Sequence, residues 1–267
     1  MKQVRPKKNL GQHFLVDLNI AKRIADTVDA PFADLPVLEV GPGMGVMTQF
    51  LTEKPRPLKV VEIDRESVDY LNEHLPRLRE NIISGDFLRM DLTEVFGGQP
   101  FVLTGNYPYD ISSQIFFKML DNKDLIPCCT GMIQHEVAVR MAAQPGNKQY
   151  GILSVLIQAW YDVEYLFTVE PGVFNPPPKV QSAVIRMTRN QVTDLGCDWP
   201  LFRRVVKTVF NQRRKMLRVS LRQLVDKDAS LFTLHSSLLT LRPEQLTIPQ
   251  FVELTNLVAA ELSQESK

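Results

Sequence analysis

The sequence predicts an α/β fold with a mostly parallel, doubly wound sheet, followed by a small all-helical domain. Three observations support this prediction. Short apolar runs alternate with stretches of helical periodicity from Val37 to Ala143, which is typical of βαβ units. The first apolar run leads directly into a glycine-rich segment that opens a helix. After about Asn190 the sequence shows helical periodicity without a strand pattern.

The elements of the sheet domain are expected in the following order. Asp17 is a suitable N-cap for an amphipathic helix over Leu18–Val28. The expected strands are Val37–Val40, Leu58–Ile63, Ile82–Ile83, Phe101–Leu103 and Ile126–Gln134. The helices between them are expected from the glycine-rich segment through Leu51, and then over Glu66–Leu78, Ile111–Leu120 and His135–Ala143. Tyr161–Val169 and Val180–Thr188 are rich in β-forming residues and flank four prolines, so we expect an antiparallel pair at the sheet edge.

The C-terminal part has helical periodicity over Leu201–Leu224, Ser230–Leu238 and Ile248–Leu262. We therefore divide the chain into a domain of residues 1–189, which begins with a basic arm of residues 1–16, and a helical domain of residues 190–267. A chain of 267 residues is long enough for one large domain with a small appendage.

The composition argues against several classes of protein. Three cysteines without metal-ligand spacing indicate reduced thiols, and four widely separated histidines form no ligand set, so we expect no metal. No apolar run reaches the roughly 18 residues that a membrane span needs, so we expect no membrane partner. The prediction is a soluble, cytoplasmic and monomeric protein.

The basic residues are unevenly distributed, although the formal net charge is only +1. From Trp199 to Val225 there are eight Arg or Lys residues and no Asp or Glu. Such a block predicts a polyanionic partner, although a solvated face would explain the charge equally well. Arg214, Arg218 and Arg222 are spaced by four, so a continuous helix would place them on one face. The residues expected to contact phosphates are Lys7, Lys8, Arg213, Arg214, Lys215, Arg218 and Arg222; pairing of the arginines with acids of the main domain is the alternative.

Gly41, Gly43 and Gly45 follow a predicted strand and open a helix, which is the context of a nucleotide-type loop. Their spacing fits S-adenosylmethionine-dependent methyltransferases better than dinucleotide-binding proteins, because Val46 stands where the latter have a third glycine. A plain strand–helix turn is the alternative.

Acidic residues end the next two predicted strands. Glu62 is placed to accept both hydroxyls of a ribose, with Asp64 as its competitor, because strand alternation puts both carboxylates on one face. Asp86 is placed to accept from an adenine amino group, and Phe87 to contact the ring. Each acid could instead cap the next helix. Open α/β sheets bind ligands at the carboxyl ends of their parallel strands, and the position of both acids at such ends favours ligand binding.

The fourth strand end carries Asn106, Tyr107, Pro108 and Tyr109. The exocyclic amine of a nucleobase is a poor nucleophile, because its lone pair is conjugated into the base ring. A fixed amide oxygen on Asn106 that accepts from the amine favours its pyramidal form and aims the lone pair at a methyl donor. Tyr109 can stack on the base, an interaction of about 1–3 kcal/mol. This chemistry gives no role to Tyr107.

With these motifs the chain resembles the small-subunit ribosomal RNA adenine dimethyltransferases, the KsgA family. The resemblance covers nearly the whole length, and the motifs that carry it are N-L-G-Q-H-F-L (9–15), E-V-G-P-G-M-G (39–45), V-E-I-D (61–64), G-D-F (85–87), N-Y-P-Y (106–109), Y-G-I-L-S-V (150–155), F-N-P-P-P-K-V (174–180) and F-N-Q-R-R-K-M-L (210–217). It implies a Rossmann-like methyltransferase sheet that uses S-adenosylmethionine. It also implies transfer of two methyl groups to N6 of each of two adjacent adenosines near the 3′ end of small-subunit (16S) rRNA, during subunit assembly.

Carried over by position, the resemblance implies site residues. S-adenosylmethionine would contact His13, Leu15, Gly41, Glu62, Asp86 and Asn106, and we include the loop glycines Gly43 and Gly45 in this site. The target adenine would lie against Asn106 and Tyr109, with Phe174 as a second stacking face. The chain departs from the family pattern at His13, where many relatives have Asn, at Tyr107, where Leu is usual, and at Gln181, which replaces an acid.

Two alternatives remain open. One is a methyltransferase of the same fold that acts on large-subunit rRNA or on adenine in DNA. The other is a non-catalytic ribosome-assembly or nucleic-acid-binding factor. The intact Asn106 and glycine loop argue against the second, because a pure binding protein could lose both.

Overall fold

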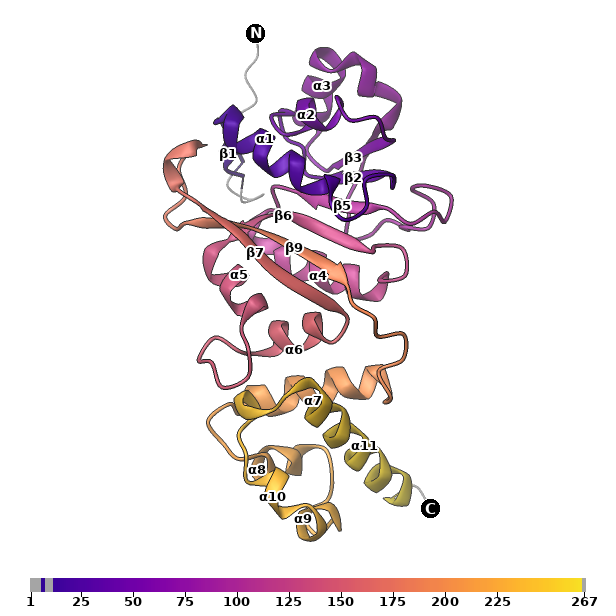
Figure 1. The fold of residues 1–267 in the computed structure, drawn as a ribbon, viewed down its shortest axis with the longest axis vertical. Helices are drawn as coiled ribbons and strands as arrows, with labels where there is room; N and C mark the ends of the chain where they lie inside the picture. The colour runs from indigo at the N-terminus through magenta and orange to yellow at the C-terminus, as the bar shows by residue number, and fades with distance from the viewer. Residues whose placement is uncertain (1–5, 8–11, 266–267) are drawn as a thin grey trace. The chain divides into compact units, whose positions relative to one another are not determined.

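The structure is a computed structural model that describes residues 6–7 and 12–265. The described chain forms two compact units (Figure 1). The first contains the residues up to Ala138 together with Asp162–Arg189, and the second contains Val139–Tyr161 together with the residues from Asn190 onward. The second unit therefore includes a segment, 139–161, that precedes the predicted helical domain. Each unit is described by itself below.

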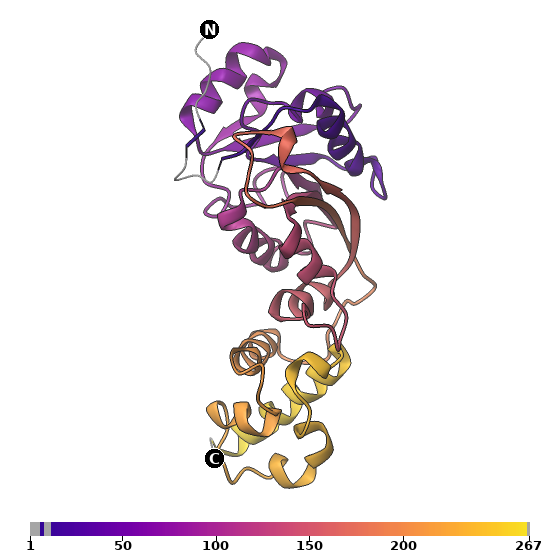
Figure 2. The same ribbon diagram turned by 90° about the vertical axis from the view of Figure 1, so that its left-hand side faces the viewer.

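The first unit is built on a seven-stranded sheet with the order β4-β3-β2-β5-β6-β9-β7. Its strands are β2 (Val37–Val40), β3 (Leu58–Glu62), β4 (Ile82–Ser84), β5 (Val102–Gly105), β6 (Cys128–Gln134), β7 (Tyr161–Val169) and β9 (Ser182–Arg189). Strands β2 to β6 pair in parallel, whereas β9 runs antiparallel to β6. The long strands β7 and β9 lie side by side at one edge (Figures 1 and 2). The predicted α/β fold with a mostly parallel sheet is confirmed.

The strand order reverses direction between β2 and β5. From β2 the chain proceeds outward through β3 to β4, and it then returns to β5 on the other side of β2. Such a switch point leaves a crevice outside the carboxyl ends of the central strands, because the following connections diverge to opposite sides. The helices of this unit are α1 (Leu18–Asp26), α2 (Thr48–Leu51), α3 (Arg65–His74), α4 (Ser112–Asp121) and α5 (His135–Ala142), which the division between the units cuts after Ala138.

The segment before α1 forms a small strand of its own. β1 (Phe14–Leu15) pairs antiparallel with β8 (Phe174–Asn175), and together they form a two-stranded sheet. Asp17 then caps α1 as predicted, because its side chain accepts from the N–H groups of Asn19 and Ile20. Phe14 and Leu15 are thereby held against the segment that follows β7.

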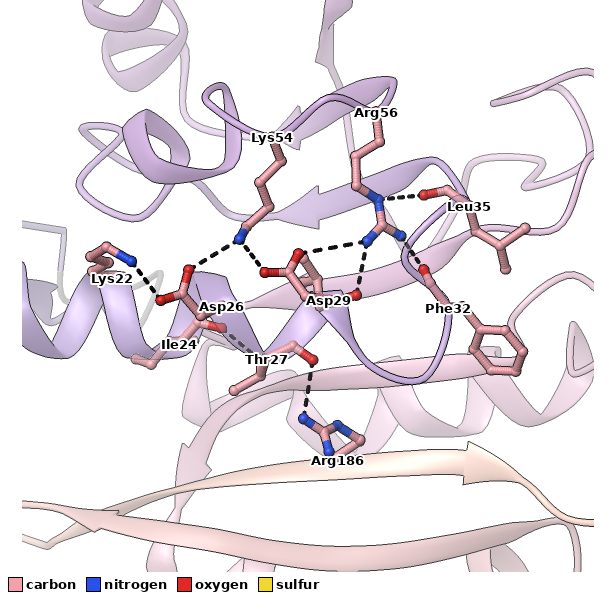
Figure 3. A network of polar contacts seen from close by, with 11 residues as sticks. Lys22, Ile24, Asp26, Thr27, Asp29, Phe32, Leu35, Lys54, Arg56 and Arg186 are labelled. Carbon is pink, nitrogen blue, oxygen red and sulfur yellow. Dashed lines mark hydrogen bonds and ion pairs between the residues drawn. The ribbon is translucent and has the colours of Figure 1, made fainter.

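A polar network fixes the other end of α1 (Figure 3). The side chain of Arg56 is only 3% exposed, and its guanidinium donates to three backbone carbonyls, those of Val28, Phe32 and Leu35. Lys54 bridges Asp26 and Asp29 at 3.0 and 2.6 Å. These contacts tie the α1–β2 connection to the segment that precedes β3.

The second unit is helical. It contains α6 (Ile152–Gln158), α7 (Trp199–Asn211), α8 (Leu217–Ser220), α9 (Leu231–Leu234), α10 (Ser236–Leu239) and α11 (Ile248–Glu265). Aromatic side chains join the two longest helices, since Phe251 of α11 lies 5.9 Å from Phe210 and 6.4 Å from Phe202 of α7, measured between ring centroids. The hydroxyl of Tyr150 donates to the carbonyl of Leu246 at 3.0 Å, which ties the start of α6 into the same core.

Three predicted helices are interrupted or shorter in the structure. The helix expected over Leu201–Leu224 ends at Asn211 and resumes at Leu217, because residues 211–216 supply no buried apolar side chain to continue the stripe. Arg214, Arg218 and Arg222 therefore do not share one helix face, as we had expected. The helix over Ser230–Leu238 is interrupted at His235, and the helix expected to reach Leu78 ends at His74, just before Pro76.

Two further features of the described chain concern membranes and metals. Among the helices of residues 6–7 and 12–265, none is both long and apolar enough to cross a bilayer. Within the same residues, no three His, Cys, Asp or Glu side chains gather in a way that could hold a metal ion.

Candidate cofactor and methyl-acceptor site

A cavity of about 260 Å³ lies at the carboxyl ends of β2, β3, β4 and β5. Its wall includes Gln12–Leu15, Glu39–Met44, Val61–Ile63, Gly85–Leu88 and Asn106–Ile111. The structure thus brings all four predicted strand ends to one space, at the switch point of the sheet, and adds the segment before α1 as a further wall.

The glycine loop needs its glycines for two different reasons. Gly41, Gly43 and Gly45 have positive φ angles of 68°, 55° and 75°, which other residues rarely adopt. Gly41 and Gly43 line the cavity. Gly45 does not, and a Cβ atom there would lie 2.8 Å from Cδ1 of Leu75. Gly45 therefore allows close packing of the loop, whereas a ligand can approach the other two.

Glu62 faces the cavity and also holds the glycine loop. Its Oε2 accepts from the N–H of Gly43 at 3.0 Å, and its Oε1 accepts from the N–H of Asp64 at 2.8 Å. Each oxygen keeps a second lone pair for a ligand hydroxyl. Burial raises the pKa of Glu62, although the backbone donors act in the opposite direction.

Asp64, the competitor of Glu62, has other partners. It caps α3, since it accepts from the N–H of Glu66 and the hydroxyl of Ser67, and it forms an ion pair of 2.5 Å with Lys7. Burial opposes its ionisation, but the hydrogen bonds from Lys7 and Ser67 outweigh this and lower the pKa of Asp64. Asp64 is not part of the cavity wall. Strand alternation could not make this distinction.

Glu39 is a cavity residue that the sequence reasoning missed. It is fully buried in β2, and among the described residues its Oε2 has no hydrogen-bond partner. Burial, together with the nearby Glu62 carboxylate, raises the pKa of Glu39 to about 8. A carboxyl group inside an otherwise apolar strand, directly before the glycine loop, was the signal that could have identified it.

The loop after β4 presents Asp86 and Phe87 to the cavity. Asp86 Oδ1 accepts from the N–H of Leu88 at 2.9 Å, so the carboxylate shapes its own turn. Its Oδ2 lies 3.4 Å from Nε of Arg89, whose side chain is 89% exposed, and this contact is weak. The carboxylate therefore keeps lone pairs for a ligand.

The segment Asn106–Tyr109, called the acceptor motif below, is held by residues that precede α1. The side-chain amide of Asn106 donates from Nδ2 to the carbonyl of His13 at 3.3 Å, which leaves its oxygen available as an acceptor. The hydroxyl of Tyr109 lies 2.5 Å from that of Ser182, and its ring stacks against His13 with 5.7 Å between centroids. Sequence reasoning did not identify Ser182.

His13 and Gln181, which the sequence analysis singled out, both have local partners. Nδ1 of His13 lies 2.9 Å from the carbonyl of Pro176, and since a carbonyl only accepts, Nδ1 must carry the proton. The side-chain amide of Gln181 donates to Glu170 at 2.7 Å. A neutral amide can make this contact, whereas an acid at position 181 would face a second carboxylate.

Leu15 and Phe174 meet through strand pairing rather than across the cavity. The register of β1 and β8 places Leu15 opposite Phe174, and both side chains are buried. Leu15 lines the cavity, but Phe174 is not part of its wall. The stacking role of Phe174 stays a prediction.

Tyr107 has a structural explanation. Its ring is fully buried beneath two glycines, because a Cβ on Gly131 would lie 2.7 Å from Tyr107 Cε2 and one on Gly105 would lie 3.2 Å from Cε1. Its hydroxyl donates to the carbonyl of Thr130 at 2.8 Å. Tyr107 thus anchors the acceptor motif to β6, although the predicted methyl-transfer chemistry assigned it no role.

A family model described as "Ribosomal RNA adenine dimethylase" matches residues 3–259. The chain belongs to this family. It is therefore a methyltransferase whose cofactor is S-adenosylmethionine.

Individual relatives agree with this assignment. A Bacteroides fragilis protein named "Ribosomal RNA small subunit methyltransferase A" is 67% identical over 258 residues, which are 97% of this chain and 94% of the relative. A Flavobacterium johnsoniae protein of the same name is 50% identical, with 98% of each chain covered. Among solved structures, a dimethyladenosine transferase from Plasmodium falciparum has the same fold, with a TM-score of 0.76, 22% identity and coverage of 95% and 98%. The 23S rRNA methyltransferase ErmE gives a TM-score of 0.66 at 26% identity, with coverage of 92% and 99%.

The predicted phosphate contacts of this dimethylase differ in their surroundings. Arg214, Lys215, Arg218 and Arg222 are exposed. Arg213 is half-buried, because it donates to the carbonyl of Asn147 at 3.3 Å and approaches Glu244 at 4.0 Å. Lys7 is committed to Asp64 and Glu66. Lys8 lies outside the described residues.

Proposed function

We propose that this dimethylase transfers methyl groups from S-adenosylmethionine to N6 of two adjacent adenosines near the 3′ end of small-subunit 16S rRNA, giving N6,N6-dimethyladenosine. It would act during small-subunit assembly, in the cytoplasm and as a monomer. The names of the 50–67% identical relatives support the substrate. The observation that carries the proposal is the single cavity that joins carboxylates suited to an adenosine, Glu62 and Asp86, to the Asn106–Tyr109 motif.

The donor set of the cavity fits S-adenosylmethionine. Glu62 would accept the ribose hydroxyls and Asp86 the adenine amine, while Phe87 and Ile63 would contact the ring. The unpartnered oxygen of Glu39 is available for the ammonium group of the methionine portion. When bound, the cofactor supplies a methyl group on a positively charged sulfur.

The chain's own residues would then act by positioning and by excluding water. Asn106 Oδ1 would accept from the target amine and restore the nucleophilicity of its lone pair. Ser182 and His13 would hold the ring of Tyr109, on which the base stacks. The amine becomes acidic only as it is alkylated, so its proton can leave to water without a strong general base.

The exposed basic residues of the second unit, with Lys8, would contact rRNA phosphates. Arg213 is the least suited of them, because it already has partners within its own unit. Methylation of large-subunit rRNA or DNA is less well supported, since ErmE, named for 23S rRNA, is only 26% identical. A non-catalytic role would leave the intact Asn106 unexplained.

The test is methyl transfer from labelled S-adenosylmethionine to unmethylated small subunits, with large subunits and duplex DNA in parallel. We expect label on small-subunit adenosines alone. Asn106→Ala should abolish transfer, whereas Asn256→Ala, which changes an exposed asparagine on α11, should not. Absence of label from all RNA would refute the enzymatic proposal, and label on only the large subunit or DNA would refute the proposed substrate.

A further inference from the structure

The turn that carries Asp86 and Phe87 ends in backbone carbonyls that accept no hydrogen bond from within the turn. Asp86 closes the near end, since its carbonyl accepts from the N–H groups of Arg89 and Met90 at 3.0 and 3.2 Å. Among the described residues, no backbone N–H donates to the carbonyls of Leu88 and Met90 across this turn, so these carbonyls need side-chain donors. A carbonyl left without a donor at a partly buried site destabilises the fold.

Lys118, on α4, supplies both donors. Its Nζ lies 3.1 Å from the carbonyl oxygen of Leu88 and 2.6 Å from that of Met90. The same ammonium lies 5.7 Å from the centroid of the Phe87 ring, within the range of a cation–π contact. Lys118 is half-buried and does not line the cavity, so it affects the cavity only through the turn residues that it contacts.

The Lys118 ammonium is partly desolvated, and its contacts must offset the free-energy cost of this desolvation. Partial burial lowers the pKa of Lys118, against the attraction of Asp86, Asp91 and Asp121. A lysine that served only to solubilise α4 would extend into water instead. One ammonium has three donors, so it can serve two carbonyls at once, and its positive charge strengthens both hydrogen bonds.

We propose that Lys118 is a positioning residue for the adenine subsite: it fixes the Asp86–Met90 turn and ties it to α4, the helix that follows the acceptor motif Asn106–Tyr109. The inference rests on the proposed function in one respect, namely that adenine lies against Asp86 and Phe87. It adds a physical link between the two halves of the site, because a displacement of α4 would move the turn that binds the cofactor.

The chain offers a matched control in Lys59. Its Nζ donates to the carbonyl of Val95 at 2.7 Å and lies 5.4 Å from the ring centroid of Phe96, so its contacts are of the same kind. The residues it holds are not part of the cavity wall. Lys59→Met should therefore destabilise the fold by the loss of one such carbonyl contact, without a change at the cofactor site.

The experiment measures the Kd of S-adenosylhomocysteine by calorimetry, the Tm of the free protein, and the rate of methyl transfer over a range of S-adenosylmethionine concentrations that reaches saturation. We expect Lys118→Met to raise Kd and the KM for S-adenosylmethionine about tenfold, with kcat within about twofold. Lys118→Arg should restore most of the affinity, and Lys59→Met should leave Kd unchanged.

Asp86→Ala separates this inference from the proposed function. If Asp86→Ala weakens binding and Lys118→Met does not, the role of Lys118 is refuted while the adenine subsite stands. If Lys118→Met and Lys59→Met raise Kd equally in step with their loss of Tm, Lys118 is only structural. If Asp86→Ala leaves Kd unchanged, the assigned adenine subsite and the inference built on it both fail.

Discussion

The hydroxyl of Tyr107 donates a hydrogen bond of 2.8 Å to the main-chain oxygen of Thr130, and so joins the acceptor motif to the neighbouring strand β6. The backbone makes a second link to β6, because the N–H of Tyr107 donates to the carbonyl of Met132 at 3.0 Å. A leucine at this position would fill part of this space but could not make the side-chain contact.

Tyr107→Phe should lower the free energy of unfolding by about 1–2 kcal/mol, because the buried carbonyl of Thr130 loses its hydroxyl donor. Urea denaturation measures this change. Tyr165→Phe is the control, since that hydroxyl makes an exposed hydrogen bond with Thr168 on β7 and its loss should cost under about 0.5 kcal/mol. Equal losses in the two variants would contradict the anchoring role.

Glu62→Ala should weaken cofactor binding much more than Asp64→Ala. Glu62 lines the cavity and holds Gly43, whereas Asp64 mainly caps α3 and pairs with Lys7. Asp64→Ala should instead lower stability by about 1 kcal/mol, the usual effect of losing an N-cap. Calorimetric titration with S-adenosylhomocysteine, together with thermal denaturation, distinguishes the two roles. The reverse order of affinities would refute the assignment of Glu62.

Glu39 should make the free protein less stable as pH rises from about 4.5 to about 8. In this window the unfolded chain has released the proton of Glu39, while the folded protein, in which the pKa of Glu39 is about 8, still holds it. The unfolded state then binds fewer protons, so the free energy of unfolding falls with pH. Glu39→Gln should remove this slope, and a slope unchanged in urea titrations at several pH values would contradict the prediction.

Arg56→Met should destabilise the protein by about 3 kcal/mol, because three backbone carbonyls lose their donor at a buried site. Arg56→Lys should recover little, since a lysine lacks the planar fork that reaches all three. The exposed ion pair of Lys22 with Asp26 provides the comparison, and Lys22→Ala should cost under about 1 kcal/mol. Chemical denaturation of the three variants tests the network of Figure 3.

Changing Arg213, Arg214 and Lys215 together to Ala should reduce small-subunit binding and leave cofactor affinity unchanged. Each lost phosphate contact should reduce the slope of log K against log salt by about 0.7–0.9. Arg214 and Lys215 are exposed, so the double variant should account for most of the effect and Arg213→Ala for little. Equal losses of subunit and cofactor binding in filter-binding and calorimetric assays would show that this block is structural.

Much of the fold follows from local pattern. The strands Val37–Val40 and Tyr161–Val169 have the predicted bounds, because alternation and apolar runs are properties of neighbouring residues. The long helix over Leu201–Leu224 was wrong for the opposite reason. Helical spacing of its arginines continues through residues 211–216, but no apolar side chain there packs on the rest of the unit.

The sequence by itself determined the α/β class, the glycine loop, and the chemistry of the four strand ends, because each depends on residue types at fixed spacing along the chain. Only the tertiary structure placed Glu62 in the cavity wall and Asp64 outside it, brought His13 and Ser182 to Tyr109, and gave Tyr107 and Lys118 their partners. These contacts join residues far apart in the chain, and strand order and register, which bring them together, are set by packing of the whole sheet rather than by any local pattern.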